Sequence, residues 1–258
     1  MKAIVNGGNF DLCGDLSAVS LLFAAGMRPD ASAIRALTRN DGNFSVSLEP
    51  AEVSSEEAAW VELLANGLTF DVTGLNPGPA AAQPEREHLF GLSEAADFAA
   101  WEAITITPGA HLAGGKTMFA VLRTLAWLGA LLADLPHLQA IVWHPARAWN
   151  APNYYRSGVQ RWIEGGVFPG LGLTAISPTG GGSLMSEGLA VFIGQELVVS
   201  PELVRDRSEG TKFAMRLVNW LIENGRITES TSMIGPSGET LRLISDQNQQ
   251  IVKVTASS

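Results

Sequence analysis

The sequence lacks the features of several common protein classes. Its 258 residues include one cysteine, Cys13, so no disulfide can form within the chain. This cysteine usage gives no sign of an oxidising compartment and favours the cytoplasm. The 17 basic residues are outnumbered by 26 acidic ones, and no three basic residues are consecutive. Because nucleic-acid binding relies on Lys and Arg that neutralise phosphates, we expect no nucleic-acid partner.

Long apolar runs are also absent from the sequence. No stretch reaches the ~18 apolar residues needed to span a bilayer, because Arg123 interrupts the most apolar helical pattern and Asp134 closes it. The apolar run 16–26 follows Asp11 and Asp15, where a signal peptide would carry basic residues. The net charge of −9 also disfavours anionic membrane surfaces. We therefore expect an acidic, soluble, cytoplasmic protein with no membrane partner.

What is present is an alternation of strand and helix patterns. In the first part, residues 1–75, the pattern predicts β-α-β-α-β. Its first helix begins after the capping residue Asp30 and ends at 40–42, and its second helix covers 54–67. A Pro/Ala-rich connection, 76–84, precedes a larger part, 85–258. We expect the two parts to pack as one globular unit.

The larger part predicts further helices and strands. Helices are expected over 92–103, 116–134, 151–166 and 211–224, and strands over 104–107, 138–144, 171–177 and 188–200, before a C-terminal hairpin. Hairpins among alternating elements favour an α+β fold, with a mixed or antiparallel sheet and helices mainly on one face. Each half also permits a β-α-β-β unit, so a duplication of such a unit stays open.

Residues 110–117, AHLAGGKT, fit the loose template of a phosphate-binding loop. Gly115, Lys116 and Thr117 stand where such a loop would supply backbone N–H groups, a cation and a magnesium ligand. The chain offers no apolar strand that ends in Asp to organise the magnesium ion. We therefore favour a glycine-rich turn at the start of a helix, and nucleotide binding remains the alternative.

Two glutamates flank the apolar segment after residue 187. Glu187 and Glu196 could act as general acid and base, together with His111 and His144. Alternatively, each glutamate caps a turn or pairs with an arginine such as Arg147 or Arg156, and this is the reading that we favour. The four histidines lack the spacing of a zinc site, so we expect no metal and no cofactor.

Aromatic residues are concentrated in 143–168. Aromatic side chains beside loops can line a ligand cleft or a partner surface, or they can fill the core between two layers. The aromatic candidates for a binding surface are Trp143, Trp149, Tyr154 and Tyr155, and the polar candidate is Gln195, which precedes Glu196.

Three of these segments carry a resemblance to a known family. WHPA at 143–146, WIEGGVFPGLGLTA at 162–175 and SEGLAVFIGQEL at 186–197 resemble the bacterial family called domain of unknown function 4261. The resemblance covers roughly residues 16–200. It implies no catalytic residues, since no activity is attached to the family. It does single out Gly194, Gln195 and Glu196 for testing.

These observations favour a non-catalytic protein-interaction or ligand-binding module. The acidic charge favours a protein partner, and the apolar composition permits a homodimer. The alternatives are a small-molecule hydrolase that uses Glu187, Glu196, His111 and His144, and a nucleotide binder that uses the 110–117 loop.

Overall fold

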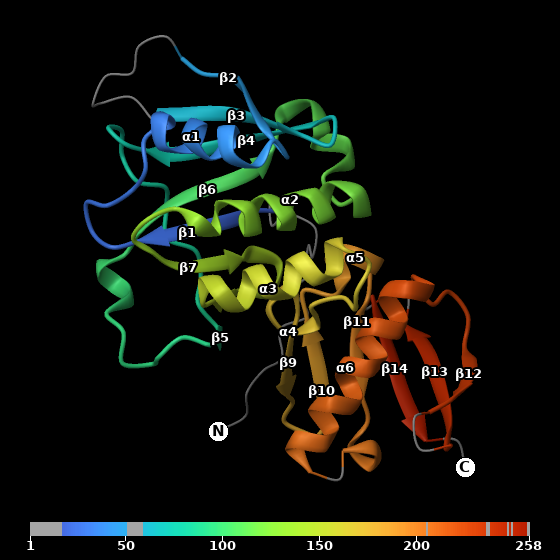
Figure 1. The fold of residues 1–258 in the computed structure, drawn as a ribbon. Coiled ribbons are helices and arrows are strands. Elements are labelled where there is room, and N and C mark those ends of the chain that lie inside the picture. Colours follow the sequence, from blue (N-terminus) through green and yellow to red (C-terminus); the bar gives the residue numbers. More distant parts are fainter. Residues whose placement is uncertain are drawn as a thin grey trace.

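The computed structural model describes residues 17–50, 59–204, 206–235, 238–246, 248 and 250–256, which form two mixed β-sheets with helices (Figure 1). The α+β class predicted from the sequence is therefore confirmed. The first sheet has eight strands, in the spatial order β2 (Ser45–Leu48), β3 (Ala59–Ala65), β4 (Leu68–Leu75), β6 (Glu102–Pro108), β1 (Val19–Phe23), β7 (Leu138–Trp143), β8 (Ala148–Asn150) and β5 (His88–Phe90).

The second sheet has six strands and follows in the chain. Its spatial order is β12 (Thr231–Ile234), β13 (Thr240–Asp246), β14 (Ile251–Ala256), β11 (Glu196–Val199), β10 (Leu184–Glu187) and β9 (Ala175–Pro178). All neighbours in this sheet are antiparallel except β11 and β14, which are parallel.

The helices lie mainly on one face of each sheet. They are α1 (Ala31–Asp41), α2 (Phe119–Leu131), α3 (Pro152–Ile163), the short α4 (Gly170–Leu173) and α5 (Ala190–Ile193), and α6 (Arg207–Asn224). Short 3-10 turns are η1 (Phe98–Ala100), η2 (Ala110–Gly115), η3 (Leu132–Asp134), η4 (His144–Ala146) and η5 (Pro201–Leu203). None of the described helices is both long enough and apolar enough to cross a membrane.

The alternation of side chains in β1 explains how the first sheet is covered. Val19, Leu21 and Phe23 belong to a large core that also contains buried residues of α2, α6 and the second sheet. Leu22 points the other way, into a small cluster around Trp149 and Phe98. One face of the sheet thus packs against helices, and part of the other against the segment that precedes β6.

The helix predicted over 54–67 is wrong over its described residues. Residues 59–65 form β3, with alternating burial, and pair with β4 through a turn at Asn66 and Gly67, which both have positive φ. Asn-Gly between two apolar runs is a strong hairpin signal, and it outweighs the helical spacing of the apolar residues. Residues 51–58 lie outside the described part of the chain.

Two other predicted elements also differ. The helix expected over 92–103 is reduced to η1, because Phe98 and Trp101 pack their rings against Trp149. The strand expected over 188–200 begins only at Glu196, and α5 precedes it. Asp30 does cap α1 as predicted, by accepting a hydrogen bond from the Ala33 N–H at 2.8 Å.

The connection between the two sheets does not fall at 76–84. The strands on either side of this segment, β4 and β6, pair with each other inside the first sheet. The first sheet ends with β8 and the second begins with β9, so α3 and residues 164–173 carry the chain from one sheet to the other.

A β-α-β-β-β unit occurs in each sheet, in line with the duplication that the sequence left open. The first unit is β1-α1-β2-β3-β4 and the second is β11-α6-β12-β13-β14. In both, the three-stranded meander ends with a strand parallel to the first one. The units differ because β6 lies between β4 and β1, whereas β14 pairs directly with β11.

Candidate functional site

The loop between β10 and β11 of the second sheet packs against η4, which follows β7 of the first sheet. Gly188 in this loop has φ +88° and packs directly onto Ala146 of η4, where a Cβ would lie 2.7 Å from the Ala146 Cβ. Gly194, which ends α5, has φ +75°. The two glycines allow the chain to turn within this short loop. The candidate glutamates Glu187 and Glu196 stand at its two ends.

Glu196 is 5% exposed and acts as a cap for the loop. Its carboxylate accepts hydrogen bonds from the N–H groups of Gly188 at 2.9 Å and Ala190 at 3.0 Å, from the Leu189 N–H and from the Ser186 hydroxyl. Burial raises the pKa of Glu196 to about 7, although these hydrogen bonds act to lower it. The carboxylate is thus engaged in fixing the turn.

Glu187 reaches back to the first sheet and forms the centre of a charged network. It accepts hydrogen bonds from Arg147 Nε at 2.5 Å and His88 Nε2 at 2.9 Å, while Arg147 also lies 3.5 Å from carboxylate oxygens of Glu85 and Glu87. Burial acts to raise the pKa of Glu187, but the hydrogen bonds from His88 and Arg147 outweigh it and leave the pKa below its ordinary value. The hydrogen bond to Glu187 in turn raises the pKa of Arg147.

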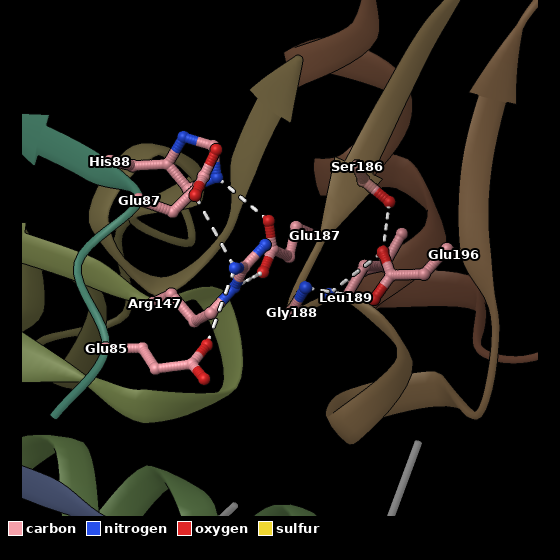
Figure 2. A network of polar contacts seen from close by, with 9 residues as sticks. All are labelled: Glu85, Glu87, His88, Arg147, Ser186, Glu187, Gly188, Leu189 and Glu196. Atoms are coloured by element: carbon pink, nitrogen blue, oxygen red, sulfur yellow. Dashed lines mark hydrogen bonds and ion pairs between the residues drawn. The ribbon is translucent and has the colours of Figure 1, made fainter. Parts of the chain in front are cut away.

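The two glutamates do not form an acid–base pair. Figure 2 shows the Glu187 carboxylate directed at Arg147 and His88, and the Glu196 carboxylate directed at Ser186. The structure has the favoured alternative instead, with Glu196 as a cap and Glu187 paired with Arg147. Arg156 pairs with Asp134. No signal in the sequence marks His88 as a partner of Glu187, because the two residues are distant in sequence and only the fold brings them together.

The two candidate histidines lie elsewhere. His144 Nε2 is hydrogen-bonded to Ser20 Oγ at 2.8 Å, and Ser20 also contacts Thr105 Oγ1 at 2.8 Å. Burial lowers the pKa of His144 to about 4, so it is neutral at pH 7. The Ser20 side chain is fully buried, so the pair is not placed to attack a substrate. His111 is exposed in η2, near Thr69.

The described residues contain no group of three or more His, Cys, Asp and Glu side chains that could hold a metal ion. The four catalytic candidates have separate hydrogen-bond partners: Glu187 has Arg147 and His88, Glu196 has the backbone of 188–190, His111 has Thr69 and His144 has Ser20.

The 110–117 segment is built as a turn. Residues 110–115 form η2, and α2 begins only at Phe119. The N–H groups of Leu112 and Met118 bond to the carbonyls of Gly109 and Gly115, both at 2.8 Å. These two N–H groups, one within the segment and one just after it, are therefore occupied by protein carbonyls, whereas a phosphate loop directs its N–H groups at the ligand. The geometry is that of the favoured glycine-rich turn, and Lys116 and Thr117 precede the helix.

Most of the expected binding-surface residues are buried. Trp143, Trp149 and Tyr155 belong to the core, and Gln195 has 0% exposure. Gln195 exchanges hydrogen bonds with the backbone of Ile227, at 2.9 and 2.8 Å, and so fixes the chain after α6 to the start of β11. Trp143, Trp149 and Gln195 therefore do not form the expected binding surface. Tyr154 is 43% exposed, and Tyr154 and the buried Tyr155 both line the groove described next.

Tyr154 borders a groove between α3 and residues 164–173. The groove has a volume of about 910 Å³. Its lining includes Tyr154, Ser157 and Arg161 of α3, the C-cap residue Glu164 of the same helix, and Val167 of the segment that follows. The volume lies within the range of roughly 300–1,000 Å³ that is typical of ligand sites.

The walls of the groove are held together by hydrogen bonds. The Tyr154 hydroxyl donates to the Leu171 carbonyl at 3.3 Å, and the Gly166 N–H donates to the Arg161 carbonyl at 2.8 Å. Asn150, at the end of β8, donates through Nδ2 to the Gly172 carbonyl at 3.4 Å, and the Gly172 backbone packs against its Oδ1. The groove is therefore formed before any ligand arrives.

No protein-family model matches this chain, and neither a curated protein nor a solved structure does. The family resemblance drawn from residues 143–197 therefore stays a prediction. Within the resembling segments, the structure gives Gln195 and Glu196 a role in holding the chain together, and it places 164–173 along the groove.

Proposed function

We propose that this protein is a non-catalytic binding module that holds an extended peptide segment of a partner protein in the groove between α3 and residues 164–173. The preformed groove of about 910 Å³ is the observation that carries the proposal. Because its walls are already fixed, a ligand that binds there loses little free energy in ordering the protein. A cytoplasmic location, favoured by the cysteine usage, is part of this proposal.

The chemistry of the groove supports a peptide as the ligand. Tyr154 offers an aromatic surface and Val167, 68% exposed, an apolar contact. Arg161 and Glu164 offer one charge of each sign near the same end, and Ser157 a hydroxyl. A peptide carries apolar side chains beside backbone donors and acceptors, and these match such a mixed lining.

The state of the acid–base candidates supports binding over catalysis. Glu187 is neutralised by Arg147, Glu196 is occupied by backbone N–H groups, and His144 bonds to the buried Ser20. Each of these groups thus has a structural role. A general acid or base needs hydrogen-bond reach to a bound substrate, and the partners of these groups take up that capacity.

A phage-displayed library of random linear peptides tests the proposal. We expect enriched peptides to bind the wild-type protein and to lose at least about tenfold in affinity for Ser157→Trp, because the indole occupies the groove. The matched control is Ser208→Trp, which places the same side chain on an exposed position of α6. Isothermal titration should give equal affinities for this control and the wild type. Failure to enrich any peptide, or equal binding to Ser157→Trp, would contradict the proposal.

A further inference from the structure

Three of the four edge strands in the described sheets carry features that hinder pairing with another strand. The register of β2 against β3 shifts between Val46 and Leu48. The edge strand β5 has three residues, and β9 ends in Pro178. Irregular register, short length and proline are the usual means by which proteins protect the edges of their sheets.

The fourth edge, β12, has no register shift and no proline, and its four residues make it as long as β2 and β9. Its sequence, Thr-Ser-Met-Ile, contains no charge and no proline, and it pairs with β13 over four consecutive residues without a shift. Figure 1 shows β12 as the outermost strand of the second sheet. Ile234 in this strand is 67% exposed, which is high for an apolar side chain. An unprotected edge with an exposed isoleucine is a template on which another strand can pair.

The neighbours of β12 define its two faces. Thr231 and Met233 lie opposite Leu243 and Leu241, which are buried in the core. Ser232 and Ile234 lie opposite Arg242 and Thr240, which are exposed. Thr231 and Met233 thus share the core face that α6 covers, and Ser232 and Ile234 share the outer face.

We propose that β12 pairs with β12 of a second copy of this chain, antiparallel and about a two-fold axis perpendicular to the sheet. The two six-stranded sheets then become one continuous sheet, with both α6 helices on the same face. This interface is separate from the groove and does not depend on the peptide-binding proposal. Antiparallel pairing of a strand with itself is self-complementary, as a two-fold contact requires.

The symmetry restricts the register of this pairing. Residues directly opposite each other must lie on the same face, so Ser232 cannot oppose Met233 of the second copy. A register centred on Met233 places Met233 opposite its own counterpart and Ile234 opposite Ser232. This register covers the exposed isoleucine of both copies, and we therefore assign it.

The local charge at this edge permits the approach of a second copy. The strand is uncharged, so the contact itself brings no like charges together, unlike an approach at β5, which follows Glu85 and Glu87. The whole chains, each with a net charge of −9, still repel at a distance. Added salt screens this repulsion, and the dimer should therefore become stronger as the ionic strength rises.

Sedimentation velocity tests the dimer over concentrations from about 1 µM to about 1 mM. We expect a concentration-dependent dimer whose dissociation constant rises at least about tenfold in Ile234→Lys, because lysine blocks an exposed edge. Val167→Lys is the matched control, since Val167 is 68% exposed against 67% for Ile234. A monomer at every concentration, or equal weakening by both substitutions, would overturn the proposal.

Cysteine cross-linking tests the register in a Cys13→Ser background. Under mild oxidation, Met233→Cys should give a covalent dimer and Ser232→Cys should not, because only residue 233 meets its own counterpart. A covalent dimer from Ser232→Cys alone would overturn the register. The lysine variants also separate the two proposals: Val167→Lys should weaken peptide binding and leave the dimer intact, and Ile234→Lys should do the reverse.

Discussion

The units β1-α1-β2-β3-β4 and β11-α6-β12-β13-β14 share a topology but are stabilised differently. In the first unit, α1 has 11 residues, and Ile34 is its one buried side chain among those described. In the second, α6 has 18 residues and buries Gly210, Ala214, Leu217, Val218 and Leu221. The second unit therefore depends on its own helix, whereas the first is covered mainly by α2, a helix outside the unit that has eight buried residues. The two units thus contribute to one shared core through different helices.

Truncation of one buried side chain in each helix should give the largest difference. Leu217→Ala in α6 should lower the free energy of unfolding by about 4 kcal/mol, since the surrounding helix cannot close the cavity. Ile34→Ala in α1 should lower it by about 2 kcal/mol, because a peripheral helix can shift to fill the space. Urea unfolding measures both values. An equal or larger loss in Ile34→Ala would show that the two helices contribute alike.

The β10–β11 loop, which packs against the first sheet, should tolerate substitution less well than the turn after α1. Gly188→Ala should destabilise the protein by about 3 kcal/mol, because the φ of +88° is strained for alanine and its Cβ would meet Ala146. Gly42→Ala, at a φ of +65° with no atom within 4 Å of the added Cβ, is the control and should cost about 1 kcal/mol. Thermal and urea unfolding of the two variants would agree with this order, and the reverse order would refute the close packing of Gly188.

Two buried titratable groups, Glu196 in β11 and His144 just after β7, should give opposite pH dependence. Burial raises the pKa of Glu196 from 4.5 to about 7, so the folded state holds more protons and stability falls as the pH rises through this range. Burial lowers the pKa of His144 from 6.5 to about 4, so the unfolded state holds more protons and stability rises with pH. The two contributions oppose each other between pH 4.5 and 6.5.

Single substitutions should reveal each contribution. Across this window, the stability of Glu196→Gln should rise with pH by about 2 kcal/mol and that of His144→Gln should fall by a similar amount, relative to the wild-type curve. Urea unfolding in a series of buffers measures the slopes. If the two variants differed from the wild-type curve by slopes of the same sign, the assigned pKa shifts of Glu196 and His144 would be wrong.

The charged network between the sheets should have the smallest effect. Arg147→Gln should lower the free energy of unfolding by about 1 kcal/mol. The loss is small because Arg147 is partly exposed and because Glu187 keeps His88 as a partner when the arginine is removed. Arg156→Gln removes an ion pair with Asp134 that joins α3 to η3, and it should cost less than about 0.5 kcal/mol. The difference should shrink in high salt, and a difference that persists there would indicate packing instead of charge.

Local signals in the sequence predicted much of the fold. Asp30 and the glycine after α1 mark the ends of that helix, and the alternation of Phe44, Val46 and Leu48 marks a strand. The Asn66–Gly67 turn was a usable signal for the β3–β4 hairpin, although the helical spacing of the apolar residues suggested otherwise. The strand predicted over 188–200 is wrong in its first half, where the Glu196 side chain caps a turn before β11. A cap that comes from a residue beyond the turn has no local signal in the sequence.

The candidate site was harder to predict for a physical reason. Glu187 and Arg147 were recognised as a candidate pair, but His88 joins them only because β5 adds to the edge of the first sheet beside β8. The groove also depends on tertiary structure, since its two walls are a helix and an irregular segment that become neighbours only when the chain folds. Trp143, Trp149 and Tyr155, which suggested a binding surface, lie in the core. Burial of such large apolar rings stabilises the fold, and the sequence alone does not distinguish this role from ligand binding.

The placement of β1 between β6 and β7 has a consequence for the synthesis of the chain. Val19 pairs with Ile106 on one side and Trp143 on the other, so the most apolar strand leaves the ribosome long before either partner exists. β11, by contrast, finds β10 already made and needs only the following residues up to β14. During translation, Val-Ser-Leu-Leu-Phe is therefore without its partner strands for most of the time that the first sheet takes to emerge, and such an exposed apolar segment is prone to aggregation.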